Sequence, residues 1–171
     1  ILVTGGGGSI GSELCYQIIN LKPKTLVIMD ISEFGLYKIQ QKLLSIINNN
    51  VHLKITIIPI LGSVLNTKDL DYVFTNYKPN MIFHVAAYKH VNLVELNPFV
   101  GLSNNVFGTL NIVKASIKYN VSKFILISTD KAVRPTNIMG ASKRISELIL
   151  QSHNSFSKST KFSIVRFGNV L

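Results

Sequence analysis

Six short runs of apolar and β-branched residues recur along the chain, and this recurrence constrains the fold more than any other feature. Each run has the length and composition of a buried strand. The intervening segments carry apolar residues at helical spacing, such as Ile39, Leu43 and Ile46. Alternating strands and helices predict an α/β fold with a doubly wound parallel sheet, and right-handed crossovers predict the strand order 3-2-1-4-5-6. The runs cover residues 1–4, 25–30, 54–60, 81–87, 123–129 and 161–167.

Composition narrows the class of protein. A chain of 171 residues with 47% hydrophobic residues is long enough to bury one substantial core. The 18 basic residues outnumber the 8 acidic ones, but the lysines form no run and do not alternate with aromatic residues. A basic excess of this size is typical of a nucleic-acid partner, a membrane-surface partner or a site for anionic substrates. We favour a bulk charge bias over a nucleic-acid groove and expect no nucleic-acid partner, and an anionic nucleotide-sugar substrate suits the same sign of charge. No apolar run approaches the ~20 residues of a membrane span, so we expect no membrane contact from this segment.

The single cysteine and the chain ends indicate the context of the domain. Cys15 excludes an internal disulfide and lies on an apolar helix face, which favours a buried packing role in a reducing compartment. The chain begins without a methionine and ends directly after a motif. We expect residues 1–171 to be the dinucleotide-binding domain of a longer protein, truncated before its substrate lobe and therefore nearly inactive alone.

A glycine-rich loop, VTGGGGSIGSE at residues 3–13, joins the first strand to the first helix. Glycines at this spacing allow a tight turn and close approach of a pyrophosphate, while the first N–H groups of the helix attract the anion. Asp30 ends the second strand 19 residues after the last glycine, where a carboxylate binds the ribose hydroxyls of NAD and repels the phosphate of NADP. This Rossmann-like arrangement predicts NAD binding. The candidate phosphate-binding residues are Gly5, Gly8, Ser9, Ile10 and Gly11.

The ends of the third and fourth strands contribute further candidates for cofactor contact. Ser63, followed by Val64, lies where an adenine ring is expected, and a serine there either bonds the ring or only shapes a turn. Ala86 and Ala87 end the fourth strand, where small side chains leave room for a ribose or serve only packing.

Three more polar residues surround the fourth strand. Lys89 and His90 are candidates for contact with a substrate phosphate or sugar, and solvated surface positions are the alternative. His84 lies within the strand and is expected in the core. No ligand spacing surrounds it, so we expect no metal site.

The fifth strand ends in ISTDKAV, which places the hydroxyl of Thr129, the carboxyl of Asp130 and the amine of Lys131 on successive residues. A polar loop in which Asp130 caps a turn is the alternative. Further along, Lys143 follows Met139 by four residues on a predicted helix, so both side chains face the same way. Because this segment and the glycine loop meet at one edge of the sheet, we favour a catalytic group.

Five motifs in order carry a resemblance to a known family: ILVTGGGGSIGSEL, AAYKHV, NNVFGTLN, LISTDKAVRPTNIMGASKR and VRFGNVL. The chain resembles the extended short-chain dehydrogenase/reductases, and within them the polysaccharide-biosynthesis branch of UDP-N-acetylglucosamine 4,6-dehydratases and UDP-sugar epimerases. The resemblance implies that Lys143 holds the nicotinamide ribose and that Thr129 takes the place of the catalytic Ser/Thr. It also implies that Asp130 is the acid at sugar oxygen 6 and Lys131 the base at carbon 5.

Four further positions are interpreted through the resemblance. Asn105 matches a structural asparagine of the fourth helix, which we count on the substrate side of the site, and Asn169 matches a residue that contacts the bound sugar nucleotide. Ser63 stands where such enzymes often have an adenine-contacting aspartate. Met139 stands where most of the superfamily has tyrosine, which is similar to the long, membrane-anchored dehydratases that retain configuration at carbon 5.

Methionine carries no proton, so another group must deprotonate oxygen 4 of the sugar. The candidates are Thr129 relayed through Lys143, or Asp130 itself. The resemblance implies an NAD-dependent 4,6-dehydratase of UDP-N-acetylglucosamine that serves surface polysaccharide synthesis. It further implies a cytoplasmic domain, with the full-length protein a homo-oligomer anchored to the inner membrane. A UDP-sugar 4-epimerase and a non-catalytic NAD-sensing domain are the alternatives.

Overall fold

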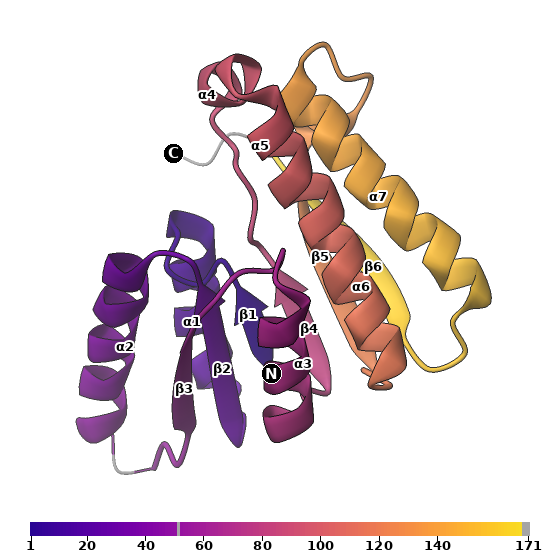
Figure 1. Cartoon of the computed structure of the whole chain (residues 1–171). Helices are drawn as coiled ribbons and strands as arrows, with labels where there is room; N and C mark the ends of the chain where they lie inside the picture. Colours follow the sequence, from indigo (N-terminus) through magenta and orange to yellow (C-terminus); the bar gives the residue numbers. More distant parts are fainter. Residues whose placement is uncertain (51, 169–171) are drawn as a thin grey trace.

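The computed structural model describes residues 1–50 and 52–168. Six strands form one parallel sheet of order β3-β2-β1-β4-β5-β6, which confirms the predicted fold and strand order (Figure 1). Strand β4 ends three residues before its predicted end. Val85 still donates to the Thr4 carbonyl, but the chain then turns to contact the glycine loop at Gly5. The strands are β1 (Leu2–Thr4), β2 (Thr25–Asp30), β3 (Thr56–Leu61), β4 (Met81–His84), β5 (Lys123–Thr129) and β6 (Lys161–Phe167).

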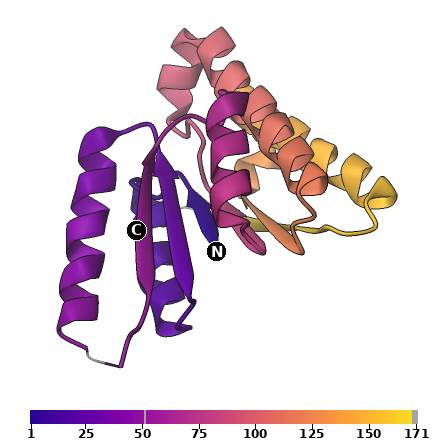
Figure 2. The ribbon, with the colours of Figure 1, turned by 60° about the horizontal axis from the view of Figure 1, so that its bottom comes forward.

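Helices cover both faces of the sheet (Figures 1 and 2). One face packs against α1 (Ser9–Asn20) and α2 (Glu33–Asn48). The other packs against α3 (Thr67–Tyr77), α6 (Gly108–Lys118) and α7 (Ile138–Phe156). Between β4 and α6 the chain forms α4 (Val91–Leu96), α5 (Pro98–Leu102) and a π-helical turn η1 (Ser103–Phe107), and a 3₁₀ turn η2 (Asp130–Ala132) follows β5.

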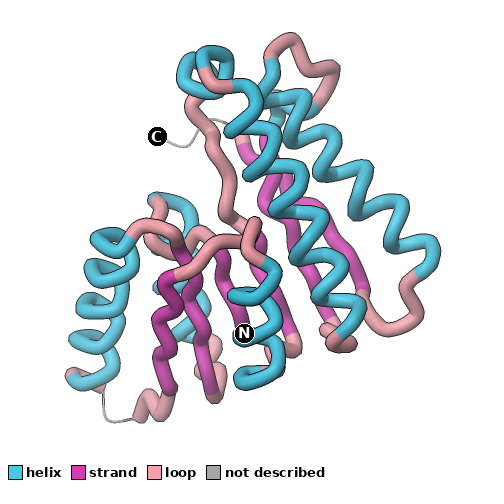
Figure 3. The backbone as a smooth tube through the Cα atoms, viewed as in Figure 1, coloured by secondary structure: helices cyan, strands magenta, loops and turns pink. Residues whose placement is uncertain are grey.

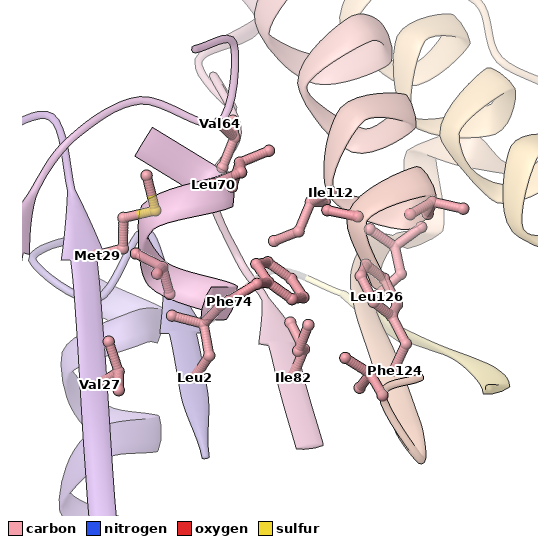
Figure 4. Packing of buried hydrophobic residues seen from close by; sticks show 14 of the residues in the cluster. Leu2, Val27, Met29, Val64, Leu70, Phe74, Ile82, Ile112, Phe124 and Leu126 are labelled. Atoms are coloured by element: carbon pink, nitrogen blue, oxygen red, sulfur yellow. The ribbon is translucent and has the colours of Figure 1, made fainter. Parts of the chain in front are cut away.

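Side chains that alternate along the strands fill two cores, one on each face of the sheet. In β2, Val27 belongs to the core beneath α3 and α6, whereas Leu26 belongs to the core beneath α1 and α2. In the first core, Phe74 of α3 and Ile112 of α6 project into the space over Ile82 of β4 (Figure 4). The long apolar runs of the sequence are therefore explained by burial on both faces.

The predicted helical faces are confirmed in part. Ile39 and Leu43 of α2 are buried, but Ile46 is 40% exposed because the buried face continues at Ile47, four residues after Leu43. Cys15 of α1 is fully buried, as predicted, and burial raises the pKa of its thiol to about 12. None of the helices within the described ranges combines the length and apolarity needed to cross a lipid bilayer.

A buried carboxylate joins helix α7 to strands β5 and β6. Glu147 of α7 is fully buried, and its oxygens accept hydrogen bonds from Ser128 of β5 at 2.7 Å and from Arg144 at 3.0 Å. Arg166 of β6 donates twice more, through Nε at 2.8 Å and Nη2 at 2.7 Å. Burial alone would raise the pKa of Glu147, but these donors, Arg166 first, outweigh it and lower the pKa to about 2. This cluster fixes α7 against the strands that carry the candidate site.

We predict that Glu147→Gln lowers the free energy of unfolding by about 3 kcal/mol at neutral pH, because two guanidinium groups lose their buried counter-ion. A depressed carboxylate pKa stabilises the fold above the ordinary value of 4.5 and loses that contribution as the pH falls toward 2. The variant should therefore show a flatter stability curve in this window. Urea unfolding across pH measures both effects. Glu13→Gln, at an exposed carboxylate of α1, is the control, and equal stability of the Glu147 variant and the control would contradict the prediction.

Candidate functional site

A cleft of about 970 Å³ opens where the parallel strands end, which we call the carboxyl edge. Its walls come from the loops after β1, β2, β3, β4 and β5, the start of α7 and the end of β6, and Figure 3 shows these loops in pink above the strands. The cleft lies where the strand order reverses between β1 and β4, the position at which open α/β sheets bind ligands. Its volume is at the upper end of the range for small-molecule sites.

The glycine loop forms the floor of the cleft through very close backbone contacts. Gly5 has a φ of 70°, and a Cβ atom there would lie 2.6 Å from the Ala86 nitrogen. A Cβ atom on Gly11 would collide with the Gly5 carbonyl oxygen. Both positions therefore require glycine for space, and Gly5 requires it for conformation as well.

Among the residues that the structure describes, no side chain caps the start of α1, which lines the cleft. Gly8 is its N-cap and supplies no side-chain cap, whereas Ser32, Asn66 and Asn137 cap α2, α3 and α7. A Cβ atom at Gly8 would meet only the Gly5 carbonyl oxygen, at 3.3 Å, so the approach to this helix end is open. The cradle suits an anion such as a pyrophosphate.

Asp30 ends β2 beside this cradle and lines the cleft. Its Oδ2 accepts from the Gly7 nitrogen at 2.8 Å, and its Oδ1 accepts from the Ser32 nitrogen at 2.8 Å. Both oxygens keep further lone pairs for ligand hydroxyl groups. The carboxylate is thus held in place by the glycine loop, as the predicted ribose contact requires.

The residues after β3 divide between the cleft wall and a turn. Val64 lines the cleft, but Ser63 is not among the lining residues. The Ser63 hydroxyl accepts from the Leu65 nitrogen at 3.2 Å, while its backbone nitrogen donates to Asp69 Oδ2 at 2.9 Å. Of the two interpretations of Ser63, the structure supports the turn. Ala86 and Ala87 both line the cleft, on the β4 side.

Asn105 supports the cleft wall from behind and does not line it. It is 1% exposed, and its Oδ1 accepts from the Tyr88 nitrogen at 2.8 Å. Its Nδ2 donates to the Tyr88 oxygen and to Ser142 Oγ, both at 2.9 Å. The interpretation of Asn105 as a substrate-binding residue is therefore corrected, because its amide is buried and already bonded. It positions Tyr88, which lines the cleft.

His84 is a core residue, as predicted. It is 1% exposed and lies between the hydroxyls of Thr4 at 2.7 Å and Thr109 at 3.0 Å. Burial, with a smaller contribution from the charge of Lys143, lowers the pKa of His84 to about 3, so the imidazole is neutral. Within the described residues, no group of three or more His, Cys, Asp or Glu side chains is arranged to hold a metal ion.

The three polar residues that follow β5 are bonded to one another. Thr129 Oγ1 donates to Asp130 Oδ1 at 2.9 Å, and Lys131 Nζ forms an ion pair with the same oxygen at 3.4 Å. The hydrogen bond from Thr129 is the largest effect on the pKa of Asp130 and lowers it; burial opposes this effect, and Lys131 lowers the pKa further. Thr129 and Lys131 line the cleft, and Asp130 is bonded to both.

Met139 and Lys143 lie on the same face of α7, as predicted, and both line the cleft. Met139 is 4% exposed and Lys143 5%. The Lys143 ammonium donates to the Ile127 carbonyl at 2.7 Å, and burial lowers the pKa of Lys143 to about 8 despite the opposing charge of Glu147.

Three predicted site residues remain: Lys89, His90 and Asn169. Lys89 and His90 line the cleft next to Tyr88. Asn169 lies outside the described residues, so its predicted contact with the sugar nucleotide stays a prediction. Sequence patterns did not identify Glu95, whose carboxylate accepts from the Ile138 nitrogen at 2.6 Å and so anchors the start of α7.

Comparisons with known proteins agree with this geometry. Residues 1–171 match the family described as polysaccharide biosynthesis protein. Over its whole length the chain is 44% identical to the capsular polysaccharide biosynthesis protein CapD of Staphylococcus aureus, and it covers 28% of that protein. It is 35% identical to a UDP-glucose 4-epimerase of Rickettsia rickettsii and 32% identical to the inverting UDP-N-acetylglucosamine 4,6-dehydratase of Campylobacter jejuni, and it covers 49% of each.

A solved structure shares the fold over nearly the whole chain. The Pen protein of Bacillus thuringiensis superposes with a TM-score of 0.83 at 34% identity, covering 99% of this chain and 50% of that one. The chain therefore spans half or less of the length of these similar proteins. Since the family match extends over every residue, the chain belongs to the polysaccharide biosynthesis protein family, a branch of the extended short-chain dehydrogenase/reductases.

Proposed function

We propose that the protein containing this chain is an NAD-dependent 4,6-dehydratase of a UDP-sugar, acting on UDP-N-acetylglucosamine to make a 4-keto-6-deoxy sugar for polysaccharide synthesis. The observation that carries the proposal is the bonded group of Thr129, Asp130 and Lys131 in a cleft that has Met139 in place of a tyrosine. An acid and a base side by side suit elimination. The dehydratase and capsular polysaccharide proteins among the relatives support this chemistry.

The residues of the cleft fit NAD. The open helix end at Gly8 would hold the pyrophosphate and Asp30 the adenosine ribose, while Lys143 would hold the nicotinamide ribose. When bound, NAD supplies a hydride acceptor for sugar carbon 4 and returns the hydride at carbon 6. Ala86 and Ala87 line the cleft with small side chains, which leave room for the nicotinamide ribose.

Thr129 is the group best placed to take the proton from oxygen 4. Its hydroxyl already donates to Asp130, whereas Lys143 donates to the Ile127 carbonyl. The proton on oxygen 4 then passes through Thr129 to the Asp130 carboxylate. Asp130 thereby becomes the carboxylic acid that elimination requires, although its lowered pKa keeps it ionised beforehand.

Lys131 is the base at carbon 5. Lys131 lines the cleft beside Asp130. As the neutral amine it accepts the hydrogen of carbon 5 as a proton. Asp130 protonates oxygen 6, which leaves as water. Lys131 finally returns its proton to carbon 5.

The cofactor preference should depend on the charge of Asp30. We predict that NAD binds more tightly than NADP by about 1–3 kcal/mol, which is about 5- to 150-fold, and that Asp30→Asn brings the ratio close to one. Asparagine still accepts from the Gly7 nitrogen, so the loop keeps its shape. Calorimetric titration of both cofactors measures the ratio. Glu33→Gln, at an exposed acid of α2, is the matched control, and an unchanged ratio in the Asp30 variant would refute the assignment.

Loss of the carbon 5 base should leave the preceding oxidation at carbon 4 intact. We predict that Lys131→Met slows elimination by about 10²–10⁴-fold while carbon 4 is still oxidised, because only the carbon 5 base is lost. Absorbance of the reduced cofactor should then accumulate, and solvent deuterium should no longer enter carbon 5. Continued exchange at carbon 5 would show that another residue is the base.

The methionine should be replaceable by another apolar side chain. We predict that Met139→Leu keeps activity within about threefold, because the two side chains have similar volume and neither carries a proton. The same steady-state assay of the intact enzyme provides the measurement. An inactive leucine variant that still unfolds at the wild-type temperature would show that the Met139 sulfur has a direct role.

A further inference from the structure

Lysines that are scattered in the sequence gather at the edge of the sheet where the parallel strands begin, which we call the amino edge. Eight of the 18 basic residues flank strand starts or helix ends there, and all eight are exposed. The chain returns to this edge before every strand, along the bottom of Figure 1, which comes forward in Figure 2. The eight are Lys22, Lys24, Lys54, Lys78, Lys118, Lys123, Lys158 and Lys161.

The arrangement exceeds what helix stability explains. Lysines at helix ends interact favourably with the helix dipole, and this accounts for the four that end or follow helices. The other four, Lys24, Lys54, Lys123 and Lys161, precede or open strands. Lys123 and Lys161 even occupy opposite positions in the paired strands β5 and β6, where like charges disfavour pairing.

Little negative charge balances the amino edge. Within residues 1–50 and 52–168, Lys118 is the only one of the eight that forms an ion pair, with Asp71 at 2.9 Å. The six strand starts, ~4.8 Å apart, make the edge ~24 Å wide. The result is a broad basic face in which one of the eight lysines is paired with a carboxylate.

Two large apolar side chains project beside these lysines. Leu21, directly after α1, is 75% exposed, and Phe156, the last residue of α7, is 83% exposed. Leu21 directly precedes Lys22, and Phe156 lies two residues before Lys158. Basic residues combined with exposed apolar side chains are typical of surfaces that enter the headgroup region of an anionic bilayer.

A hollow on the same edge offers a recessed polar position. Its volume is about 370 Å³, and it lies between the loops that precede β4 and β5. Lys78 and Lys118 line it together with Asn80, Tyr119 and Asn120. Ammonium and amide donors suit the phosphate of a lipid headgroup.

We propose that the amino edge docks on the surface of an anionic lipid bilayer. The cleft lies at the opposite edge, so docking leaves it open to soluble nucleotide sugars. The proposal departs from the expectation of no membrane contact from this segment, which was based on the lack of a spanning apolar run. A nucleic-acid strand fits less well, because strand binding uses rows of stacking aromatic side chains, whereas these apolar residues stand at the ends of two separate helices.

Vesicle flotation with the purified chain tests the proposal. The probes are phosphatidylcholine vesicles with and without phosphatidylglycerol, and we expect binding only to the anionic ones. Replacing Lys24, Lys54, Lys123 and Lys161 together with Gln should weaken binding roughly 100-fold or more, at about fivefold per lysine. The matched control replaces Lys38, Lys42, Lys68 and Arg134, which are exposed and lie away from the strand starts, and should bind within about threefold of wild type because distant charges are screened.

Two further variants test the apolar contribution to binding and guard against unfolding of the fourfold variant. Phe156→Ser should weaken binding at high salt, where the apolar contribution dominates. If the fourfold variant unfolds, the double replacement of Lys123 and Lys161 relieves a like-charge pair and should still lower binding roughly 25-fold. Equal binding to neutral vesicles, an equal loss in the control, or tighter binding of a single-stranded oligonucleotide than of anionic vesicles at the same salt would each overturn the proposal.

Discussion

The contact between the glycine loop and the end of β4 is the one on which the cleft depends. Gly5 meets the backbone of Ala86, and Gly11 meets the backbone of Gly5, with no space for a Cβ atom at either position. This packing turns the chain away after His84 and aligns Gly7 with the Asp30 carboxylate. A single steric requirement, the lack of space for a Cβ atom at Gly5 and Gly11, therefore explains the glycine spacing. It also accounts for the early end of β4 and the open start of α1.

Parallel topology then sorts the polar residues of the chain between two edges. Asp30, Thr129 and Lys131 lie at or directly after strand ends and line the cleft, while the lysines that precede strands gather at the other edge. The fold was predictable from sequence because a sheet buried on both faces requires uninterrupted apolar runs. The candidate site was predictable for the same reason, since residues that follow such runs share one edge. The basic edge was not predictable from the sequence, because its lysines are scattered along the chain and only the parallel sheet brings them to one edge.

Other features depend on partners that local sequence does not specify. In the sequence, Glu147 looks like any charged residue of a helix. Its role depends on two hydrogen bonds from Arg166, which lies 19 positions later in β6. Asn105 is polar enough for a ligand contact, and only the fold shows that its amide is used by Tyr88 and Ser142. The hydroxyl of Ser63 suited an adenine contact and a turn equally until its bond to the Leu65 nitrogen was known.

The central claim is that a cleft with Met139 in place of tyrosine uses Asp130 and Lys131 for elimination. Product analysis by NMR of the intact enzyme supplied with UDP-N-acetylglucosamine and NAD tests it most directly. The account predicts a 4-keto-6-deoxy sugar with the configuration at carbon 5 retained. A 4-hydroxy epimer without any ketone, or cofactor binding without turnover of a UDP-sugar, would contradict it.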